Sequence, residues 1–333
     1  MRLGLIGAGA IARRHAQVLS ADDEVVVAAV CDVDLARAQE LAATLDAQAT
    51  ADWAELVAAD LDAVVVCTPP AAHAAPAVAA FEHGLAVYLE KPLARSHADG
   101  ERIVAGWRDA GVVCAVGYQW RSLEILARAR DALDGAMPGM LVSRSFGPTE
   151  PGRGDLGEAG ASSWFADRRA GGGILFELGS HDIDLQVALA GPAARVHAAG
   201  ARGLLALRGR DDRDLDDAVA VLLEYAGGAI GLVAVAWSTS GRAPVYTLDV
   251  EAAATALHLD LDPAFRLTGT ANGRRLEAAE TADPRRTSLE RFLAAARSGD
   301  PTGVPCSPAD ALHSLRAAVA AEQAVASGRP VEL

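Results

Sequence analysis

The first 116 residues alternate short apolar runs with Ala-rich amphipathic stretches, and this alternation restricts the possible folds more than any other feature of the chain. The runs EVVVAAVC and AVVVC are apolar throughout, as is typical of parallel strands that helices cover on both faces. The alternation therefore predicts βαβ units and a doubly wound parallel sheet. The predicted elements are strand 2–6, helix 10–20, strand 25–31, helix 34–45, helix 52–58, strand 62–67, helix 73–83, strand 86–89, helix 96–110 and strand 112–116.

The segment GAGAIA follows the first predicted strand directly and opens the first predicted helix. In this pattern Gly7 permits a tight turn, Gly9 lets the backbone approach a pyrophosphate, and Ala12 allows the helix to pack closely on the sheet. Ala10 and Ile11 begin the helix, whose N-terminus offers free N–H groups to an anion. The segment and its position predict a Rossmann-type dinucleotide site.

Asp32 ends the second predicted strand, where its carboxylate can accept hydrogen bonds from both ribose hydroxyls of an adenosine. Asp34 is expected to be the N-cap of the following helix. Because no arginine follows Asp32 immediately, a 2′-phosphate would be repelled. We therefore expect NAD as the cofactor, in preference to NADP.

The segment CTPPAAH follows strand 62–67, and its two prolines direct the chain outward at the carboxyl edge of the sheet. Ligands of open α/β sheets bind along this edge, so Thr68 and Pro69 are candidate cofactor contacts. His73 could face the cofactor or simply occupy the first turn of the next helix.

Lys91, in LEKPLA, is the only lysine in the chain, whereas the other 29 of its 30 basic residues are arginine. It follows a further predicted strand and therefore lies at the same carboxyl edge as the glycine turn. An ammonium is a compact charge whose pKa can fall on burial, whereas a guanidinium stays protonated. This position favours a chemical role for Lys91 over two alternatives, a chance survivor of a biased composition and a surface lysine held by Glu90.

Six segments, GAGAIA, CDVD, CTPPAAH, EKP, GYQWR and GGGILFELGSHDID, occur in this order along the chain. Over essentially its whole length, the chain therefore resembles the glucose-fructose oxidoreductase and inositol dehydrogenase family, also called Gfo/Idh/MocA. The resemblance implies that Lys91 approaches both nicotinamide and substrate, that Glu90 contacts the cofactor, and that Pro92 follows a cis peptide bond.

Strands dominate after GYQWR, which marks the predicted passage from a dinucleotide-binding domain, residues 1–118, to a second domain, residues 119–333. This second domain is expected to be α+β, with a mostly antiparallel open sheet. Helices would cover one face of the sheet, and the resemblance implies that the other face forms a homodimer or homotetramer. The predicted strands are 140–147, 194–202, the two arms of a hairpin that turns at Gly227–Gly228, and two strands in VYTLDVEAAATALHLDL.

A helix is predicted over residues 171–191, and Glu177 and His181 lie one turn apart on it. A carboxylate in this position can accept the imidazole N–H and raise the basicity of the ring. The residues alone favour an ordinary buried or capping histidine, whereas the resemblance implies that His181 is the base toward the substrate hydroxyl. Many polyol-oxidising relatives carry Asp in place of Glu177, which leaves the presented hydroxyl open.

Four further residues are candidates for ligand contacts. Gln119 and Arg121 lie at the predicted domain junction, where clefts form, and could contact the cofactor or sugar hydroxyls. Asp184 could bind the substrate or serve only the fold of its domain. Trp164 is a candidate substrate contact, although Phe165 follows it where relatives often place an arginine.

The composition narrows the classes of partner. A net charge of −14 argues against nucleic acid and anionic membranes, and no apolar run approaches the ~20 residues of a membrane helix. The four cysteines lie far apart, without a CxxC motif or a Cys/His cluster, which favours reduced cytoplasmic thiols and no metal site. We therefore expect a cytoplasmic protein that acts on a small molecule.

Together these features predict an NAD-dependent dehydrogenase that reversibly oxidises a secondary hydroxyl of a sugar, cyclitol or related polyol. His181, oriented by Glu177, would take the hydroxyl proton, Lys91 would hydrogen-bond the same oxygen, and the hydride would pass to the nicotinamide. Two alternatives stay open. One is glycoside cleavage by transient oxidation and elimination with recycled NAD, and the other is a non-catalytic, ligand-sensing relative.

Overall fold

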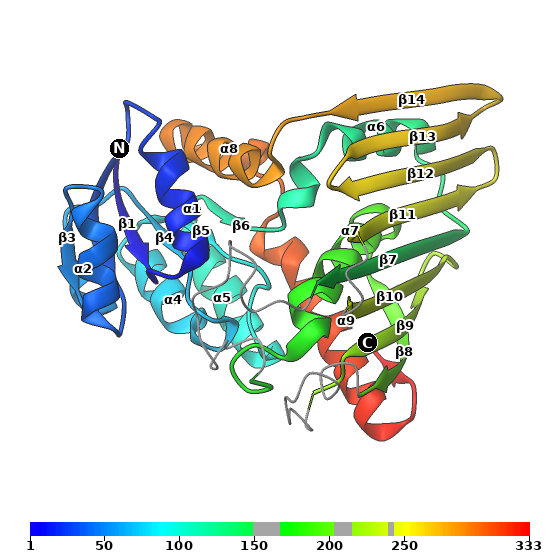
Figure 1. Ribbon diagram of the computed structural model, residues 1–333, viewed down its shortest axis with the longest axis horizontal. Helices are drawn as coiled ribbons and strands as arrows, with labels where there is room; N and C mark the ends of the chain where they lie inside the picture. Colours follow the sequence, from blue (N-terminus) through cyan, green and yellow to red (C-terminus); the bar gives the residue numbers. More distant parts are fainter. Residues whose placement is uncertain (149–166, 203–214, 239–242) are drawn as a thin grey trace. The chain divides into compact units, whose positions relative to one another are not determined.

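The computed structural model describes residues 1–148, 167–202, 215–238 and 243–333, which form two compact units (Figure 1). The first unit comprises residues 1–119 and 283–312, and the second comprises residues 120–282 and 313–333. The segment 283–312, which lies within the second domain of the sequence analysis, thus packs with the first unit.

A six-stranded parallel sheet forms the centre of the first unit, in the order β3-β2-β1-β4-β5-β6. This order confirms the predicted doubly wound sheet. The winding reverses between β1 and β4, and ligands of such sheets bind beyond the carboxyl ends of the strands at this point. The elements are β1 (Arg2–Ile6), α1 (Ala10–Leu19), β2 (Val26–Cys31), α2 (Leu35–Ala43), β3 (Gln48–Thr50), α3 (Trp53–Val57), β4 (Ala63–Val66), α4 (Ala74–Glu82), β5 (Ala86–Leu89), α5 (His97–Ala110), β6 (Cys114–Val116) and α8 (Pro284–Ser298).

Helix α8, which the sequence analysis did not predict, packs against α1 and β5. Tyr88 on β5 anchors it, because its ring meets Phe292 edge to face with the centroids 5.6 Å apart. The Tyr88 hydroxyl also donates a hydrogen bond of 3.2 Å to the Ser288 hydroxyl. These contacts between distant parts of the sequence are the physical reason that α8 belongs to the first unit.

The second unit contains a nine-stranded sheet in the order β14-β13-β12-β11-β7-β10-β9-β8-β15. The pair β7 and β10 is parallel, and every other described pair is antiparallel, which confirms the mostly antiparallel prediction. The elements are α6 (Glu124–Leu133), β7 (Met140–Pro148), α7 (Ser180–Ala190), β8 (Ala193–Ala201), β9 (Ala218–Tyr225), β10 (Ile230–Ser238), β11 (Val245–Ala252), β12 (Thr255–Asp262), β13 (Phe265–Ala271), β14 (Arg274–Glu280), most of α9 (Pro308–Ser327), and β15 (Val331–Glu332).

Helices α6 and α7 cover one face of this sheet: α6 contacts β12, β13 and β14, and α7 contacts β7 and β10. Side chains alternate accordingly, and Leu257, Leu259 and Leu261 of β12 are buried on the covered face. The predicted hairpin between β9 and β10 is confirmed. Strands β13 and β14 were not predicted, because their sequences FRLTGTA and RRLEAAE mix polar and apolar residues without a continuous apolar run, as is common near a sheet edge.

Candidate functional site

The glycine turn between β1 and α1 has the geometry of an anion cradle. Gly7 has a φ of +99°, and a Cβ at this position would lie 2.8 Å from the Cys67 carbonyl group. At Gly9, by contrast, a Cβ would meet nothing within 4 Å, and no side chain caps the helix that Gly9 begins. The open space in front of uncapped N–H groups fits a phosphate.

Asp32 follows β2 and lies beside this turn. Its Oδ2 accepts a hydrogen bond of 2.8 Å from the Ala8 N–H, and its Oδ1 accepts one of 2.9 Å from the Asp34 N–H. The carboxylate is partly exposed and therefore keeps lone pairs available to a ligand. The Asp34 carboxylate accepts from the Ala36 N–H, which confirms Asp34 as the N-cap of α2.

His73 connects the loop after β4 to the segment after Lys91. Its Nε2 lies 2.8 Å from the Thr68 carbonyl oxygen, and its Nδ1 lies 3.3 Å from the Leu93 carbonyl oxygen. Burial lowers the pKa of His73, although these hydrogen bonds oppose the effect. The Thr68 hydroxyl is buried and has no hydrogen-bond partner among the described residues, so a bound ligand could supply one.

Glu90 and Lys91 follow β5 at the carboxyl edge of the sheet. The Lys91–Pro92 peptide bond is cis, as the resemblance implied, and Lys91 is half-buried. Glu90 is buried: its Oε1 lies 2.7 Å from Nε2 of His15, and its Oε2 accepts a hydrogen bond of 3.1 Å from the Lys91 N–H. Burial raises the pKa of Glu90, but the hydrogen bond and charge of His15 and the charge of Lys91 lower it overall.

No motif in the sequence distinguishes His15. The only signal available was its position on the buried face of α1, one turn after Ala12. The uncapped helix, the open space at Gly9, the Thr68 hydroxyl and Asp32 are together compatible with a dinucleotide. Pro69 is the N-cap of the short helical turn Pro70–Ala72 at this edge. Gln119 is buried and ends the stretch 1–119 of the first unit.

In the second unit, His181 lies in the first turn of α7 and is 6% exposed. A π-helical turn, Leu175–Gly179, precedes it and carries Glu177, where the sequence predicted an uninterrupted α-helix. In a π-turn the backbone hydrogen bonds join residues five apart, whereas in an α-helix they join residues four apart. The four-residue spacing therefore does not by itself put Glu177 and His181 on one face. Their pairing stays a prediction. Such turns are frequent at functional sites.

The Trp120 ring packs beside His181, and Tyr246 packs in turn against Trp120. The Trp120 ring lies with its centroid 4.9 Å from that of His181, and the Tyr246 ring lies 5.9 Å from that of Trp120. A Cβ on Gly147 would collide with the Tyr246 hydroxyl, so the glycine leaves room for this ring. Neither Trp120 nor Tyr246 was predicted as a site residue. Trp120 stands in GYQWR, whereas nothing in the sequence distinguishes Tyr246.

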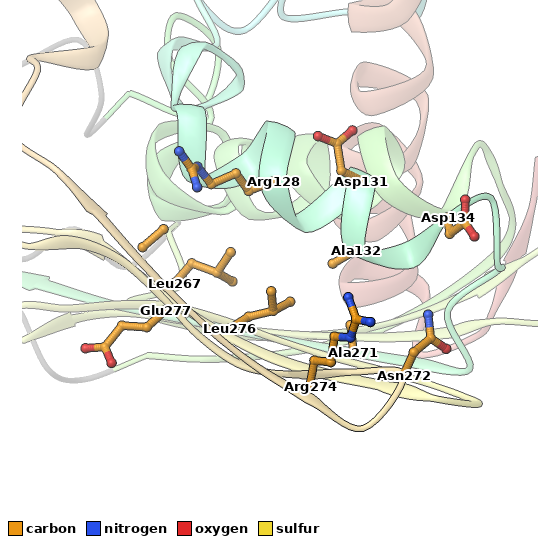
Figure 2. A pocket seen from close by; sticks show the side chains of 11 residues that line it. Arg128, Asp131, Ala132, Asp134, Leu267, Ala271, Asn272, Arg274, Leu276 and Glu277 are labelled. Atoms are coloured by element: carbon orange, nitrogen blue, oxygen red, sulfur yellow. The ribbon is translucent and has the colours of Figure 1, made fainter.

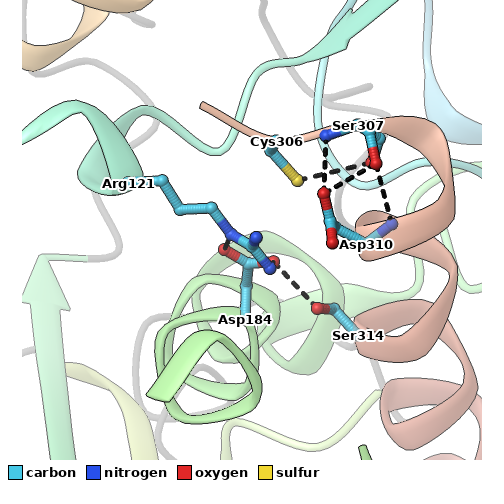
Figure 3. Close-up of polar contacts among 6 residues, drawn as sticks. All are labelled: Arg121, Asp184, Cys306, Ser307, Asp310 and Ser314. Atoms are coloured by element: carbon cyan, nitrogen blue, oxygen red, sulfur yellow. Dashed lines mark hydrogen bonds and ion pairs between the residues drawn. The ribbon is translucent and has the colours of Figure 1, made fainter. Parts of the chain in front are cut away.

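Arg121 and Asp184 form a buried ion pair (Figure 3). The Asp184 carboxylate also accepts a hydrogen bond of 2.8 Å from the Ser314 hydroxyl on α9. This geometry matches the structural alternative for Asp184, and the expected ligand contacts of both residues stay predictions.

Asp182, between His181 and Asp184, is fully buried, and burial raises its pKa to about 8.

An open groove of about 570 Å³ lies between α6 and the β13–β14 hairpin (Figure 2). Charged side chains of both signs line it, among them Arg128, Asp131 and Glu277, and it contains none of the predicted site residues. Within the described ranges, no cluster of three metal-binding side chains occurs, and no helix is long and apolar enough to cross a membrane.

The predicted site residues are thus divided between the units. Those expected to bind the cofactor lie in the first unit, and Arg121, Glu177, His181 and Asp184 lie in the second. Trp164 lies outside the described residues.

Family models match both parts of the chain. Residues 1–118 match the oxidoreductase family with an NAD-binding Rossmann fold, and residues 141–271 match the Gfo/Idh/MocA C-terminal domain.

Curated relatives and a solved structure with which the chain aligns are named as dehydrogenases. The 4-carboxy-2-hydroxymuconate-6-semialdehyde dehydrogenase of Sphingobium sp. is 37% identical over 123 residues, which is 36% of this chain and only 39% of that relative's length. The myo-inositol 2-dehydrogenase of Thermotoga maritima is 27% identical over 254 residues, covering 75% of this chain and 71% of the relative. The structure of UDP-N-acetylglucosamine 3-dehydrogenase from Acidithiobacillus ferrooxidans superimposes with a TM-score of 0.80 at 25% identity, over 98% of this chain and 97% of the other.

Proposed function

Because this chain belongs to the Gfo/Idh/MocA family of NAD-binding oxidoreductases, we propose that it oxidises a secondary hydroxyl of a sugar, cyclitol or related polyol. The observation that carries this proposal is the position of Lys91. The only lysine of the chain is half-buried at the carboxyl edge of a dinucleotide-binding sheet, directly after a buried carboxylate. Relatives named for inositol and for a nucleotide sugar support the substrate class.

Two side chains would handle the substrate hydroxyl. NAD, when bound, accepts the hydride from the carbon that carries this hydroxyl. His181 takes the hydroxyl proton, with the Trp120 ring packed against the imidazole and limiting its rotation. Lys91 donates a hydrogen bond to the same oxygen as it becomes a carbonyl. General acid and base assistance of this kind accelerates a reaction by roughly 10²- to 10⁴-fold.

We further propose that the cofactor is NAD in preference to NADP. The Asp32 carboxylate is held by two backbone N–H groups beside the glycine turn, and Val33 and Asp34 follow it without a basic side chain. A 2′-phosphate would therefore meet a fixed negative charge. The four cysteines are buried thiols rather than disulfides, as is typical of a reducing compartment, and this supports the expected cytoplasmic location.

On the face of the second sheet opposite α6 and α7, exposed apolar side chains support self-association into a dimer or tetramer. Met140 pairs with Ile230 on adjacent strands, and these side chains are 40% and 45% exposed. Leu232, two residues further along β10, is 37% exposed on the same face. Exposed apolar side chains gathered on one face are typical of an interaction surface.

The experiment that tests the proposed reaction incubates the purified protein with NAD and a panel of inositols, aldoses, sugar acids and glycosides, and records NADH formation at 340 nm. We expect NADH with at least one polyol or sugar, and a large loss of rate in His181→Ala. Glycoside cleavage without net NADH would instead establish the transient-oxidation reaction. NAD binding without either reaction would favour the ligand-sensing alternative.

A further inference from the structure

We propose that His15 is a positioning residue for the reaction: its imidazole fixes the Glu90 carboxylate, which in turn holds the backbone of Lys91. The inference rests on the proposed function, because it concerns the lysine that would act on the substrate. His15 itself lies on α1, 75 residues before Glu90 in the sequence.

The hydrogen bonds of the Glu90 carboxylate define this arrangement. Both partners of the His15–Glu90 pair are buried, with side-chain exposures of 2% and 11%, and the atoms Nε2 and Oε1 are 2.7 Å apart. An ionised carboxylate only accepts, so Nε2 of His15 must carry the proton and donate it. The other oxygen accepts from the Lys91 N–H. One carboxylate therefore connects α1 to the backbone of Lys91.

The charges around Glu90 show why His15 is needed. Burial raises the pKa of this carboxyl, whereas the hydrogen bond and charge of His15, and the charge and backbone N–H of Lys91, lower it. Three further titratable groups face Glu90, namely Cys67, His73 and Tyr88. Burial raises the pKa of Cys67 and Tyr88 and lowers that of His73, so all three favour their neutral forms. Without His15, Lys91 alone would stabilise the ionised form of Glu90 against the effect of burial.

Packing fixes the imidazole in this position. Its ring meets the Tyr88 ring edge to face, with the centroids 5.3 Å apart, and Tyr88 is itself held by Phe292 and Ser288 of α8. Gly117 leaves room on the other side, because a Cβ there would lie 3.3 Å from the Glu90 carboxyl group. The donor and the acceptor are thus oriented before any ligand binds, which is the condition for positioning another residue.

The single lysine allows a test that does not depend on turnover. An amine-reactive reagent can modify only Lys91 and the N-terminus, and peptide mass spectrometry separates the two. The rate of Lys91 modification is measured against pH in the wild type, His15→Phe, His15→Gln and His83→Phe. Phe keeps a ring of similar shape without a donor, Gln restores an N–H donor, and exposed His83 on the same unit is the matched control.

In His15→Phe we expect the pKa of Glu90 to rise and its protonated fraction to grow, because the imidazole no longer opposes the effect of burial. A neutral Glu90 stabilises the Lys91 ammonium less, so more of the lysine is present as reactive amine. Modification at pH 7 should therefore be several-fold faster than in the wild type. His15→Gln and His83→Phe should stay close to the wild type. Equal rates in His15→Phe and His83→Phe would overturn the proposal, as would a His15→Gln variant altered as much as His15→Phe.

Turnover then provides a separate readout. With an active substrate, His15→Phe should lower kcat by roughly 10- to 100-fold, as expected for a misplaced catalytic group, while the Kd for NAD changes less than threefold. The loss should grow as the pH falls, because protonation of Glu90 removes the active form. Changed Lys91 reactivity without turnover on any substrate would refute the proposed function and leave the positioning role intact. If His15→Phe does not fold, Glu90→Gln gives the same test: unchanged Lys91 reactivity would overturn the proposal.

Discussion

The guanidinium of Arg121 donates two hydrogen bonds, of 2.7 and 2.8 Å, to the carboxylate of Asp184. The two side chains are 6% and 2% exposed, and the Ser314 hydroxyl donates a third hydrogen bond to the same carboxylate. Bidentate pairs of this kind are strong and geometrically specific. The pair therefore ties Arg121, the last residue of GYQWR, to α7, the helix that carries His181.

We predict that Arg121→Met destabilises the protein, because it leaves the Asp184 charge buried with the hydroxyl of Ser314 but without its cation. Removing one partner of a buried pair costs about 3–5 kcal/mol. The measurement is the unfolding midpoint in urea. Arg128→Met, which removes an exposed arginine of α6, is the control. If Arg121 served only to bind substrate, KM would rise and the midpoint would not change.

Asp182 should make the stability depend on pH. Burial raises its folded-state pKa from 3.8 to about 8, so the folded protein keeps a proton that the unfolded chain releases. The stabilisation from this group is complete below pH 4 and is lost as the pH rises toward 8. No described group makes a well-formed hydrogen bond to either oxygen, and the Ser145 hydroxyl only partly opposes the effect of burial.

We therefore predict that Asp182→Asn is stabilised relative to the wild type at pH 8, by an amount on the order of a few kcal/mol, and less so at pH 5. Urea unfolding at the two pH values measures the difference. Asp310→Asn, at an exposed carboxylate near the start of α9, should show no comparable change between them. A constant difference between Asp182→Asn and the wild type at both pH values would show that Asp182 is ionised in the folded protein.

Cofactor choice should depend on Asp32. We predict that Asp32→Ala weakens NAD binding by roughly 10- to 100-fold, the equivalent of one or two hydrogen bonds to a charged group, and weakens NADP binding much less. The Kd values of both cofactors, measured by quenching of protein fluorescence, give the ratio. Asp34→Ala, which removes the cap of α2 and an exposed ion pair with Arg37, should keep the wild-type ratio. An unchanged ratio in Asp32→Ala would exclude this carboxylate as the selective group.

Self-association should depend on the uncovered sheet face. We predict that Leu232→Asp lowers the mass measured by light scattering after size-exclusion chromatography, because it places a charge within the apolar surface of β7 and β10. Leu333→Asp, at another exposed leucine, should leave the mass unchanged. A wild-type mass equal to one chain would contradict this surface as a self-association site.

Much of the fold follows from local patterns. Continuous apolar runs predicted the parallel strands, and Gly227–Gly228 between two such runs predicted the β9–β10 hairpin. Asp34 before an amphipathic stretch predicted a helix N-cap. These features depend on neighbouring residues only, which is why the sequence reveals them.

Other features depend on residues that are distant in the sequence. The pairing of His15 with Glu90 and the packing of α8 on Tyr88 require the fold to bring distant segments together. The π-helical turn before His181 has no distinct sequence pattern, so the predicted α-helical spacing of Glu177 did not anticipate it. Likewise, Arg121 and Asp184 each suggested a ligand contact, because the sequence does not show that they neutralise each other.

The most direct test of the central claim is the initial rate of NADH formation by Lys91→Ala, measured with the best substrate of the panel at saturating NAD and compared with the wild type. Lys91 is the only lysine, so the substitution removes the one ammonium side chain of the protein. We predict that Lys91→Ala binds NAD normally and loses at least about 100-fold in rate. A rate equal to that of the wild type would contradict the assignment of hydride transfer to a site built around Lys91.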